Sequence, residues 1–235
     1  MTGNMISVET SGATGQMGAY MATHEAEAHT YAPGLVIIQE VFGVNDFIRA
    51  TVEAYAAKGF ITAAPDIFWR LEPGVQLNPN KEEEFNRGIE LMGQFDQPTG
   101  IDDIQATITT LRNHPACNGK VGVLGFCLGG RLAYMAALGT DADVAVSYYG
   151  VGIETMLDQA GNIKIPTLLH IAEDDGFVPP EAQAAIKDGL TADNFDVHIY
   201  PGVDHGFARF TGMHYDEAAA NLANERSLAL LNSAL

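Results

Sequence analysis

Short runs of apolar residues alternate along the chain with longer stretches in which apolar residues recur every three or four positions. The short runs have the length and the branched residues typical of buried strands. The longer stretches are typical of helices that bury one face. The predicted strands are Met5–Glu9, Met17–Ala22, Leu35–Gln39, Phe60–Ala64, Val121–Gly125, Asp143–Tyr148, Pro166–Ile171 and Asp196–Tyr200. The predicted helices are Asp46–Lys58, Lys81–Gly93, Gly100–Asn113, Leu128–Leu138, Pro180–Leu190 and Tyr215–Leu231.

The alternation of strands and helices predicts an α/β fold, in which helices cover both faces of a mostly parallel sheet of about eight strands. The first two strands flank Ser11–Gly15 and predict a hairpin or meander, and the segment Leu71–Asn80, rich in Pro, Gly and Asn, predicts a loop. Because no repeat or linker divides the chain, we expect one domain over residues 1–235. Ligands of such sheets bind at the carboxyl ends of the strands, so candidate chemistry is sought there.

The charge of the chain argues against some classes of partner. Thirty acidic residues against twelve basic ones give a net charge of −18, which is unfavourable for nucleic acid and for anionic membranes. The two cysteines make no zinc pattern, and no phosphate-binding glycine motif follows a strand, so we expect no metal and no cofactor. Without a signal peptide, a membrane span or a zipper pattern, we expect a cytoplasmic monomer acting on a small molecule.

One predicted junction between a strand and a helix carries a nucleophile motif. The strand Val121–Gly125 runs directly into Cys127, and a helix is predicted from the next residue. Gly125 and Gly129 lie two positions to either side of Cys127, the spacing of the α/β-hydrolase nucleophile elbow with cysteine in place of serine. So tight a turn needs glycine at both positions. The helix N-terminus would favour a thiolate and bind an oxyanion, whereas the alternative is a buried structural cysteine.

An acid and a histidine follow later in the chain, each just beyond a predicted strand. The α/β-hydrolases place nucleophile, acid and histidine in that order. Asp175 follows the strand Pro166–Ile171, and His205 follows Asp196–Tyr200. Asp175 is favoured as the acid because Asp-x-x-Val-Pro resembles a hydrolase acid loop, and Asp174 is the alternative. The other interpretation is a solvated acidic run and an exposed loop histidine.

Four segments match the motifs of one enzyme family. They are Gln39–Asn45 (Gln-Glu-Val-Phe-Gly-Val-Asn), Gly125–Gly130 (Gly-Phe-Cys-Leu-Gly-Gly), Tyr148–Gly150 (Tyr-Tyr-Gly) and His205–Arg209 (His-Gly-Phe-Ala-Arg). Together they resemble the dienelactone hydrolase (carboxymethylenebutenolidase) family, in register from about Leu35 to Phe210. The resemblance implies an α/β-hydrolase with a triad of Cys127, Asp175 and His205.

The resemblance also implies roles for residues around this triad. Glu40 is a fourth participant that controls the activation of the thiol, and the amides of Val41 and Leu128 form the oxyanion hole. The family's substrate is an enol lactone with a free carboxylate, and Arg209 matches a carboxylate-binding arginine. Without the resemblance, Glu40 would be an ordinary strand-end acid and Arg209 a surface arginine. Further residues expected at the substrate are Phe42, Tyr149 and Trp69, the last with packing as its alternative.

One segment departs from the family pattern. The position that matches a second carboxylate-binding arginine of the family is Phe85. Arg87 is close in sequence but lies about 200° around a helix from that position, which leaves open whether it substitutes. The run Glu82–Glu84 would repel a carboxylate. The departure argues against dienelactone itself as the substrate and leaves lactone or ester hydrolysis standing.

Three functions are therefore weighed. The first is a cofactor-free cysteine hydrolase that cleaves a small lactone or ester through a thioester acyl-enzyme. The second is a general carboxylesterase or thioesterase that uses the same triad. The third is a ligand-binding or redox-sensing protein without catalysis. The retention of cysteine, acid and histidine in the required order favours an enzyme.

Overall fold

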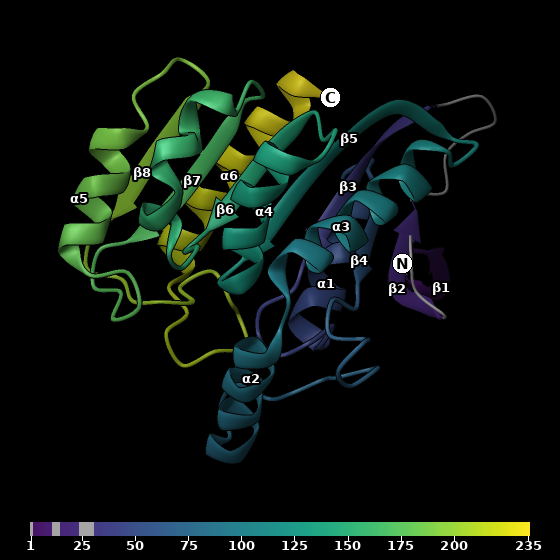
Figure 1. Ribbon diagram of the computed structural model, residues 1–235, viewed down its shortest axis with the longest axis horizontal. Helices are drawn as coiled ribbons and strands as arrows, with labels where there is room; N and C mark the ends of the chain where they lie inside the picture. The colour runs from purple at the N-terminus through teal and green to yellow at the C-terminus, as the bar shows by residue number, and fades with distance from the viewer. Residues whose placement is uncertain (1, 11–14, 24–30) are drawn as a thin grey trace.

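The computed structural model describes residues 2–10, 15–23 and 31–235, and within these ranges eight strands form one sheet. The strands are β1 (Asn4–Glu9), β2 (Gln16–Thr23), β3 (Ala32–Ile38), β4 (Ile61–Pro65), β5 (Cys117–Phe126), β6 (Val144–Tyr148), β7 (Thr167–Ala172) and β8 (Phe195–Tyr200). Their spatial order is β1-β2-β4-β3-β5-β6-β7-β8 (Figure 1). The pairs β1–β2 and β2–β4 are antiparallel, and all other pairs are parallel. The predicted α/β fold is confirmed.

Helices cover both faces of the sheet. They are α1 (Asp46–Ala56), α2 (Glu82–Gln94), α3 (Gln97–Arg112), α4 (Leu128–Gly139), the 3-10 helix η1 (Ile153–Asn162), α5 (Pro180–Gly189) and α6 (Glu217–Ala234). One apolar core joins α1 and α6 to the sheet, and a second joins α3, α4, α5 and η1 to it (Figure 1). These two layers bury the strands on both sides, which explains why the strand sequences are continuously apolar.

The local signals locate most elements to within a few residues. Helix α1 begins after Asn45, whose side chain accepts a hydrogen bond from the amide of Ile48 at 3.3 Å. Helix α3 begins at Gln97, three residues earlier than predicted, because Asp96 caps it by accepting from the amide of Thr99 at 2.9 Å. The 3-10 helix η1 was not predicted. The antiparallel pairing of β1 with β2 is as expected, while most of the predicted turn, residues 11–14, lies outside the described residues.

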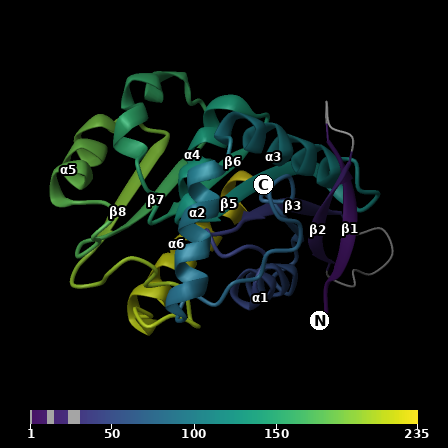
Figure 2. The same ribbon diagram turned by 60° about the horizontal axis from the view of Figure 1, so that its bottom comes forward.

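Helix α2 joins the core of α3 and α4 through Leu91, but most of it lies outside the two layers. It projects beyond the end of the sheet at the bottom of Figure 1, near the loop that follows β8. With that end turned forward, α2 crosses in front of the central strands (Figure 2). Gly88 makes this approach possible, because a Cβ atom there would lie only 2.8 Å from the carbonyl oxygen of Val41. The helix therefore packs directly on the loop that follows β3.

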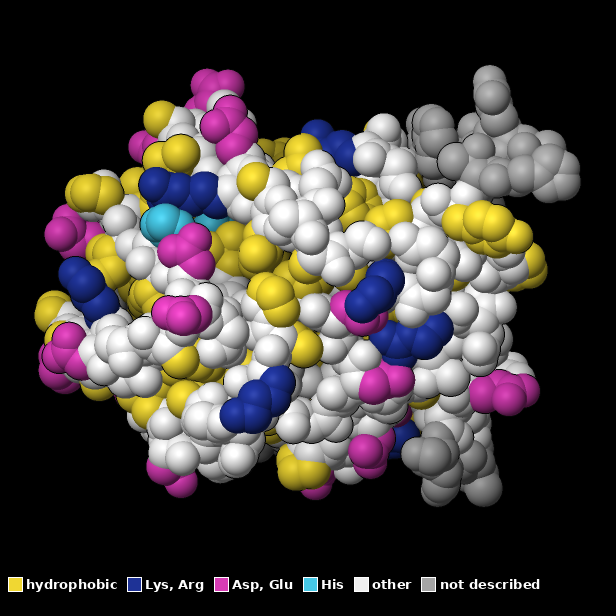
Figure 3. Space-filling model, turned by 90° about the horizontal axis from the view of Figure 1, so that it is seen from above, with side chains coloured by type: hydrophobic (Ala, Val, Ile, Leu, Met, Phe, Trp, Pro, Cys, Tyr) yellow, Lys and Arg dark blue, Asp and Glu magenta, His cyan; other side chains and the backbone are white. Residues whose placement is uncertain are grey.

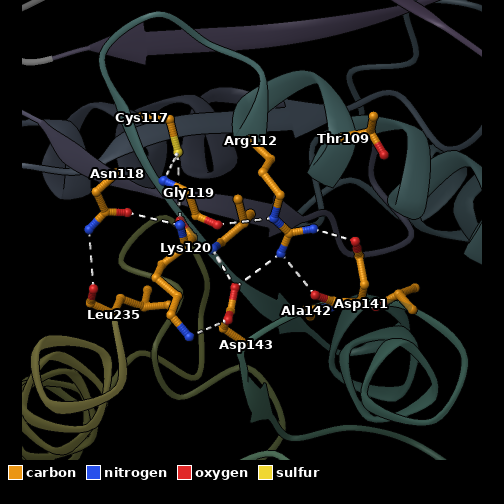
Figure 4. Close-up of polar contacts among 12 residues, drawn as sticks. Thr109, Arg112, Cys117, Asn118, Gly119, Lys120, Asp141, Ala142, Asp143 and Leu235 are labelled. Atoms are coloured by element: carbon orange, nitrogen blue, oxygen red, sulfur yellow. Dashed lines mark hydrogen bonds and ion pairs between the residues drawn. The ribbon is translucent and has the colours of Figure 1, made fainter.

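Ion pairs and hydrogen bonds tie the chain together near the start of β5. Arg112 at the end of α3 binds the carboxylates of Asp141 and Asp143, and Lys120 binds Asp143 at 2.7 Å (Figure 4).

Seen from above, basic side chains are interspersed with acidic ones across the visible face (Figure 3). No helix in the described part of the chain is long and apolar enough to cross a membrane.

Candidate active site

Cys127 lies in a strained turn between β5 and α4. Its backbone has φ 55° and ψ −115°, a conformation that costs energy for a residue with a side chain. A Cβ atom at Gly125 would lie 1.9 Å from the carbonyl oxygen of Gly129, and one at Gly129 would lie 2.3 Å from that of Ile38. No side chain fits at either position. The predicted reason for the two glycines is therefore correct, and the turn holds Cys127 at the carboxyl end of the sheet.

His205 and Asp175 come together from two neighbouring loops at the same end of the sheet. The Nδ1 atom of His205 lies 2.7 Å from an oxygen of Asp175, whose side chain is fully buried. The other oxygen of Asp175 accepts from the amide of Phe177 at 2.8 Å. Asp174 lies at the adjacent cavity and has no contact with the imidazole among the described hydrogen bonds. Of the two candidate acids, the structure brings Asp175 to His205.

The surroundings of His205 favour its protonated form. Burial lowers the pKa of this histidine, but the charge of Cys127 and the hydrogen bond to Asp175 outweigh burial and raise the pKa to about 10. The rings of Tyr149 and Phe177 each pack edge-on at 4.9 Å between centroids. The Nε2 atom is buried and has no hydrogen-bond partner of good geometry in the described chain. Asp175 and Cys127 therefore both act to keep the proton on the imidazole of His205.

We expect the pKa of His205 to fall well below about 10 in Cys127→Ala. The variant removes the charge of Cys127 that raises the pKa, while the burial that lowers it remains. An NMR titration of the imidazole nitrogens measures the shift. Cys117→Ala is the matched control, because Cys117 lies at the start of β5 and contacts the carbonyl oxygen of Lys120. An unchanged pKa in Cys127→Ala would show that the thiol does not act on this imidazole.

A buried ion pair lies beside Cys127. The Nη1 atom of Arg209 donates to Oε1 of Glu40 at 2.8 Å, and the side chains are only 10% and 1% exposed. The second carboxylate oxygen of Glu40 is buried without a hydrogen-bond partner in the described chain. Arg209 also lies over the ring of Phe42, 5.4 Å from its centroid. The residues expected to control the thiol and to bind a carboxylate are thus bound to each other.

A cavity of about 300 Å³ opens beside these groups. It is lined by Val41, Phe42, Phe85, Ile89, Met92, Cys127, Val151, Asp174, Gly176, Phe177, Asp204, His205, Arg209 and His214. The backbone amides of Val41 and Leu128 make no hydrogen bond within the described chain, so both are free to donate. Leu128 is the first residue of α4, where an amide has no partner inside the helix. The cavity is thus lined by Val41, the thiol of Cys127 and the imidazole of His205, and the amide of Leu128 follows Cys127 directly in the chain.

Some residues that were considered for substrate binding do not line the cavity. The prediction that Trp69 binds substrate is not supported by its position, because its indole donates to Asp103 at 2.9 Å and packs against the small core of β1 and β2. Tyr149 packs against His205 and does not line the cavity. Arg87 points away and pairs with Glu72 and Glu90, so it does not replace the missing arginine.

Sequence analysis missed several cavity residues. They include Ile89, Met92, Val151, Phe177 and His214. The helical spacing of Phe85, Ile89 and Met92 was a usable signal, because it places them on one face of α2. No group of three or more His, Cys, Asp or Glu side chains that could hold a metal ion occurs in the described residues.

The strained cysteine turn after β5 of a mostly parallel sheet, with an acid after β7 and a histidine after β8, defines an α/β-hydrolase. The model of the dienelactone hydrolase family matches residues 17–235, and the chain belongs to that family. The chain is 41% identical over 201 residues to carboxymethylenebutenolidase of Pseudomonas putida, covering 85% of each chain. It is 37% identical over 223 residues to carboxymethylenebutenolidase 1 of Cupriavidus pinatubonensis, covering 94% of each. The protein is therefore a carboxylic ester hydrolase.

A solved structure shares the fold. It is a dienelactone hydrolase-like promiscuous phosphotriesterase from metagenomic libraries, which superposes with a TM-score of 0.80 at 22% identity and covers 100% of this chain and 99% of its own. At this level of identity the likeness concerns the fold alone.

Proposed function

We propose that the protein hydrolyses small lactones or esters through a thioester on Cys127, with His205 and Asp175 completing a catalytic triad. The observation that carries the proposal is the 2.7 Å contact of Asp175 with His205 at the cavity that also exposes Cys127. Asp175 orients the imidazole and stabilises its protonated form. Membership of the dienelactone hydrolase family and the strained turn at Cys127 add support.

The acylation step uses the groups at the base of the cavity. The thiolate sulfur of Cys127 attacks the ester carbonyl carbon and forms a carbon–sulfur bond. The carbonyl oxygen becomes an oxyanion, to which the free amides of Val41 and Leu128 donate. When the intermediate collapses, the bond to the alcohol oxygen breaks and the imidazolium of His205 gives that oxygen its proton. In a lactone the released alcohol stays attached to the acyl group.

Deacylation regenerates the enzyme. The neutral imidazole of His205 takes a proton from water, and the resulting hydroxide adds to the thioester. The carbon–sulfur bond breaks, the acid leaves, and the thiolate of Cys127 is again paired with the imidazolium. Glu40 is held by Arg209 in this structure, which leaves His205 as the proton acceptor for the thiol. We propose that release of Glu40 from Arg209 modulates how readily the thiol ionises.

Trapping the acyl-enzyme tests the proposal. Wild-type protein is mixed with p-nitrophenyl acetate, quenched in acid during turnover and digested. We expect an acetyl group on the peptide that contains Cys127 and none on the peptide that contains Cys117. Phenyl acetate and p-nitrophenyl acetate form the same acetyl-enzyme. When methanol is added, the ratio of methyl acetate to acetate released from this intermediate should therefore be the same for both esters. Turnover without acetyl-Cys127, together with ratios that depend on the leaving group, would contradict a thioester route.

A general carboxylesterase is the second candidate, and the character of the cavity favours it. Of the side chains that line the cavity, those from α2 are apolar. Such a lining suits esters of apolar acids or alcohols as well as lactones. Initial rates with acyclic and cyclic substrates separate the two functions by the ratio of their kcat/KM values.

A further inference from the structure

One wall of the cavity is an apolar helix face. Phe85, Ile89 and Met92 of α2 line it at helical spacing, and the ring of Phe85 packs on that of Phe42 with 5.8 Å between centroids. Val151 closes another side. The volume of about 300 Å³ lies at the low end for ligand pockets and is about twice that of an engineered cavity that binds benzene. The cavity suits a compact substrate with an apolar group of about one ring.

The cation beside the cavity is already neutralised. Among the lining residues, all within the described ranges, Arg209 is the one lysine or arginine. Its Nη1 atom binds Glu40. Cβ atoms built at Gly206 and Gly212 would lie 3.0 Å from its Nη2 and 2.6 Å from its Nε, so the backbone of its own loop encloses the other nitrogens. A substrate carboxylate would therefore have to share or displace a single guanidinium that Glu40 already holds.

The remaining charges at the cavity are acidic or paired. Asp174 and Asp204 line it, and His214 is bound to Asp204 with 2.7 Å between Nδ1 and the carboxylate oxygen. The first turn of α2 adds the acidic run Glu82–Glu84 on the same helix. Over distances of about 8–10 Å these carboxylates repel an approaching anion. The net charge of −18 acts in the same direction.

We infer that this site selects neutral carboxylic esters and lactones with an apolar substituent and discriminates against substrates that carry a free carboxylate. The inference rests on the proposed hydrolysis at Cys127 and names its substrate class. The apolar substituent lies against Phe85, Ile89 and Met92, while the ester carbonyl reaches the thiol. Phe85 is the residue that determines the charge preference, because it occupies the wall facing Phe42 and has no charge of its own.

A matched pair of substrates measures the preference. Methyl 4-acetoxybenzoate and 4-acetoxybenzoate differ by one methyl group and one negative charge. The kcat/KM for each ester is divided by the rate constant for hydrolysis of that ester by hydroxide, which corrects for its intrinsic reactivity. We expect wild-type kcat/KM to favour the neutral ester by at least about tenfold, because the anion finds no free cation in the apolar cavity. A ratio at or below one would overturn the inference.

Variants on α2 locate the cause. Phe85→Arg should lower the ratio at least about tenfold by giving the carboxylate a partner. Glu181→Gln, in the exposed first turn of α5 and outside the cavity lining, changes the net charge equally and should leave the ratio unchanged. Ile89→Lys, one turn along the cavity-lining face, repeats the test if Phe85→Arg fails to fold. If neither cation lowers the ratio in a folded variant, the assignment to this wall is wrong.

The controls separate this inference from the proposed function. If Cys127→Ala abolishes hydrolysis of both substrates but wild type prefers the carboxylated one, the triad stands and the substrate class is wrong. If neither ester is hydrolysed in a manner that depends on Cys127, the proposed function fails, and the inference fails with it.

Discussion

Cys127→Ala should lower kcat/KM for ester hydrolysis by at least about 10⁴-fold, the scale of losses when a catalytic nucleophile is removed. The variant removes the atom that would bond to the acyl carbon, and the elbow, the imidazole and the free amides remain. The expected thermal midpoint lies within about 4 °C of wild type, because replacing one half-buried thiol changes stability by only about 1 kcal/mol. Steady-state rates with p-nitrophenyl acetate and a thermal melt measure both effects.

The second cysteine supplies the matched control. Cys117 is also partly exposed, but it begins β5, whereas Cys127 follows the last residue of that strand. Figure 4 shows the surroundings of Cys117. Cys117→Ala should retain wild-type kcat/KM. Hydrolysis that persists at full rate in Cys127→Ala would rule out the thiol as nucleophile. Loss of activity in both variants with loss of fold would instead point to a structural role.

Arg209→Met should destabilise the folded protein by about 3–5 kcal/mol, the usual cost of removing one partner of a buried ion pair. Glu40 would then remain buried with neither oxygen bound to a cation. Urea unfolding, followed by circular dichroism, measures the change in the free energy of unfolding. Because a neutral pair removes the stranded charge, Glu40→Leu combined with Arg209→Met should regain most of the loss.

An exposed ion pair gives the comparison. Arg87 is 40% exposed and pairs with Glu72 and Glu90 on the surface. Arg87→Met should change the free energy of unfolding by less than about 1 kcal/mol, because water already solvates both charges. Equal effects of Arg87→Met and Arg209→Met, or a double variant no more stable than Arg209→Met, would contradict an energetic role for the buried pair.

Local patterns in the sequence were sufficient for the parts of the site that depend on neighbouring residues. The turn at Cys127 is recognisable because glycine is sterically required two positions to either side, and this requirement is visible in six residues. The positions of Asp175 and His205 after strands follow from the apolar runs that precede them. The edge at which they meet follows from the parallel topology alone, since all such strands end on the same side.

Contacts between distant segments were beyond these patterns. Glu40 and Arg209 are separated by 169 positions, and nothing in either segment indicates that each neutralises the other. The same limit applies to Trp69, whose neighbours in the N-terminal core belong to strands that the sequence places far away. Asp174 and Asp175 are adjacent in the loop that follows β7. The path of that loop determines that Asp175, and not Asp174, faces the imidazole of His205.

The sequence alone therefore determined the order of the strands and α-helices, the tight turn at Cys127 and the end of the sheet where the candidate site lies, because sterics and hydrophobic periodicity act over a few residues. Only the tertiary structure decided that α2 folds over this end and lines the cavity with an apolar face, and that the one arginine there is already bound to a buried glutamate. Packing across the whole fold sets which charges remain free, and free charges determine which substrates are bound.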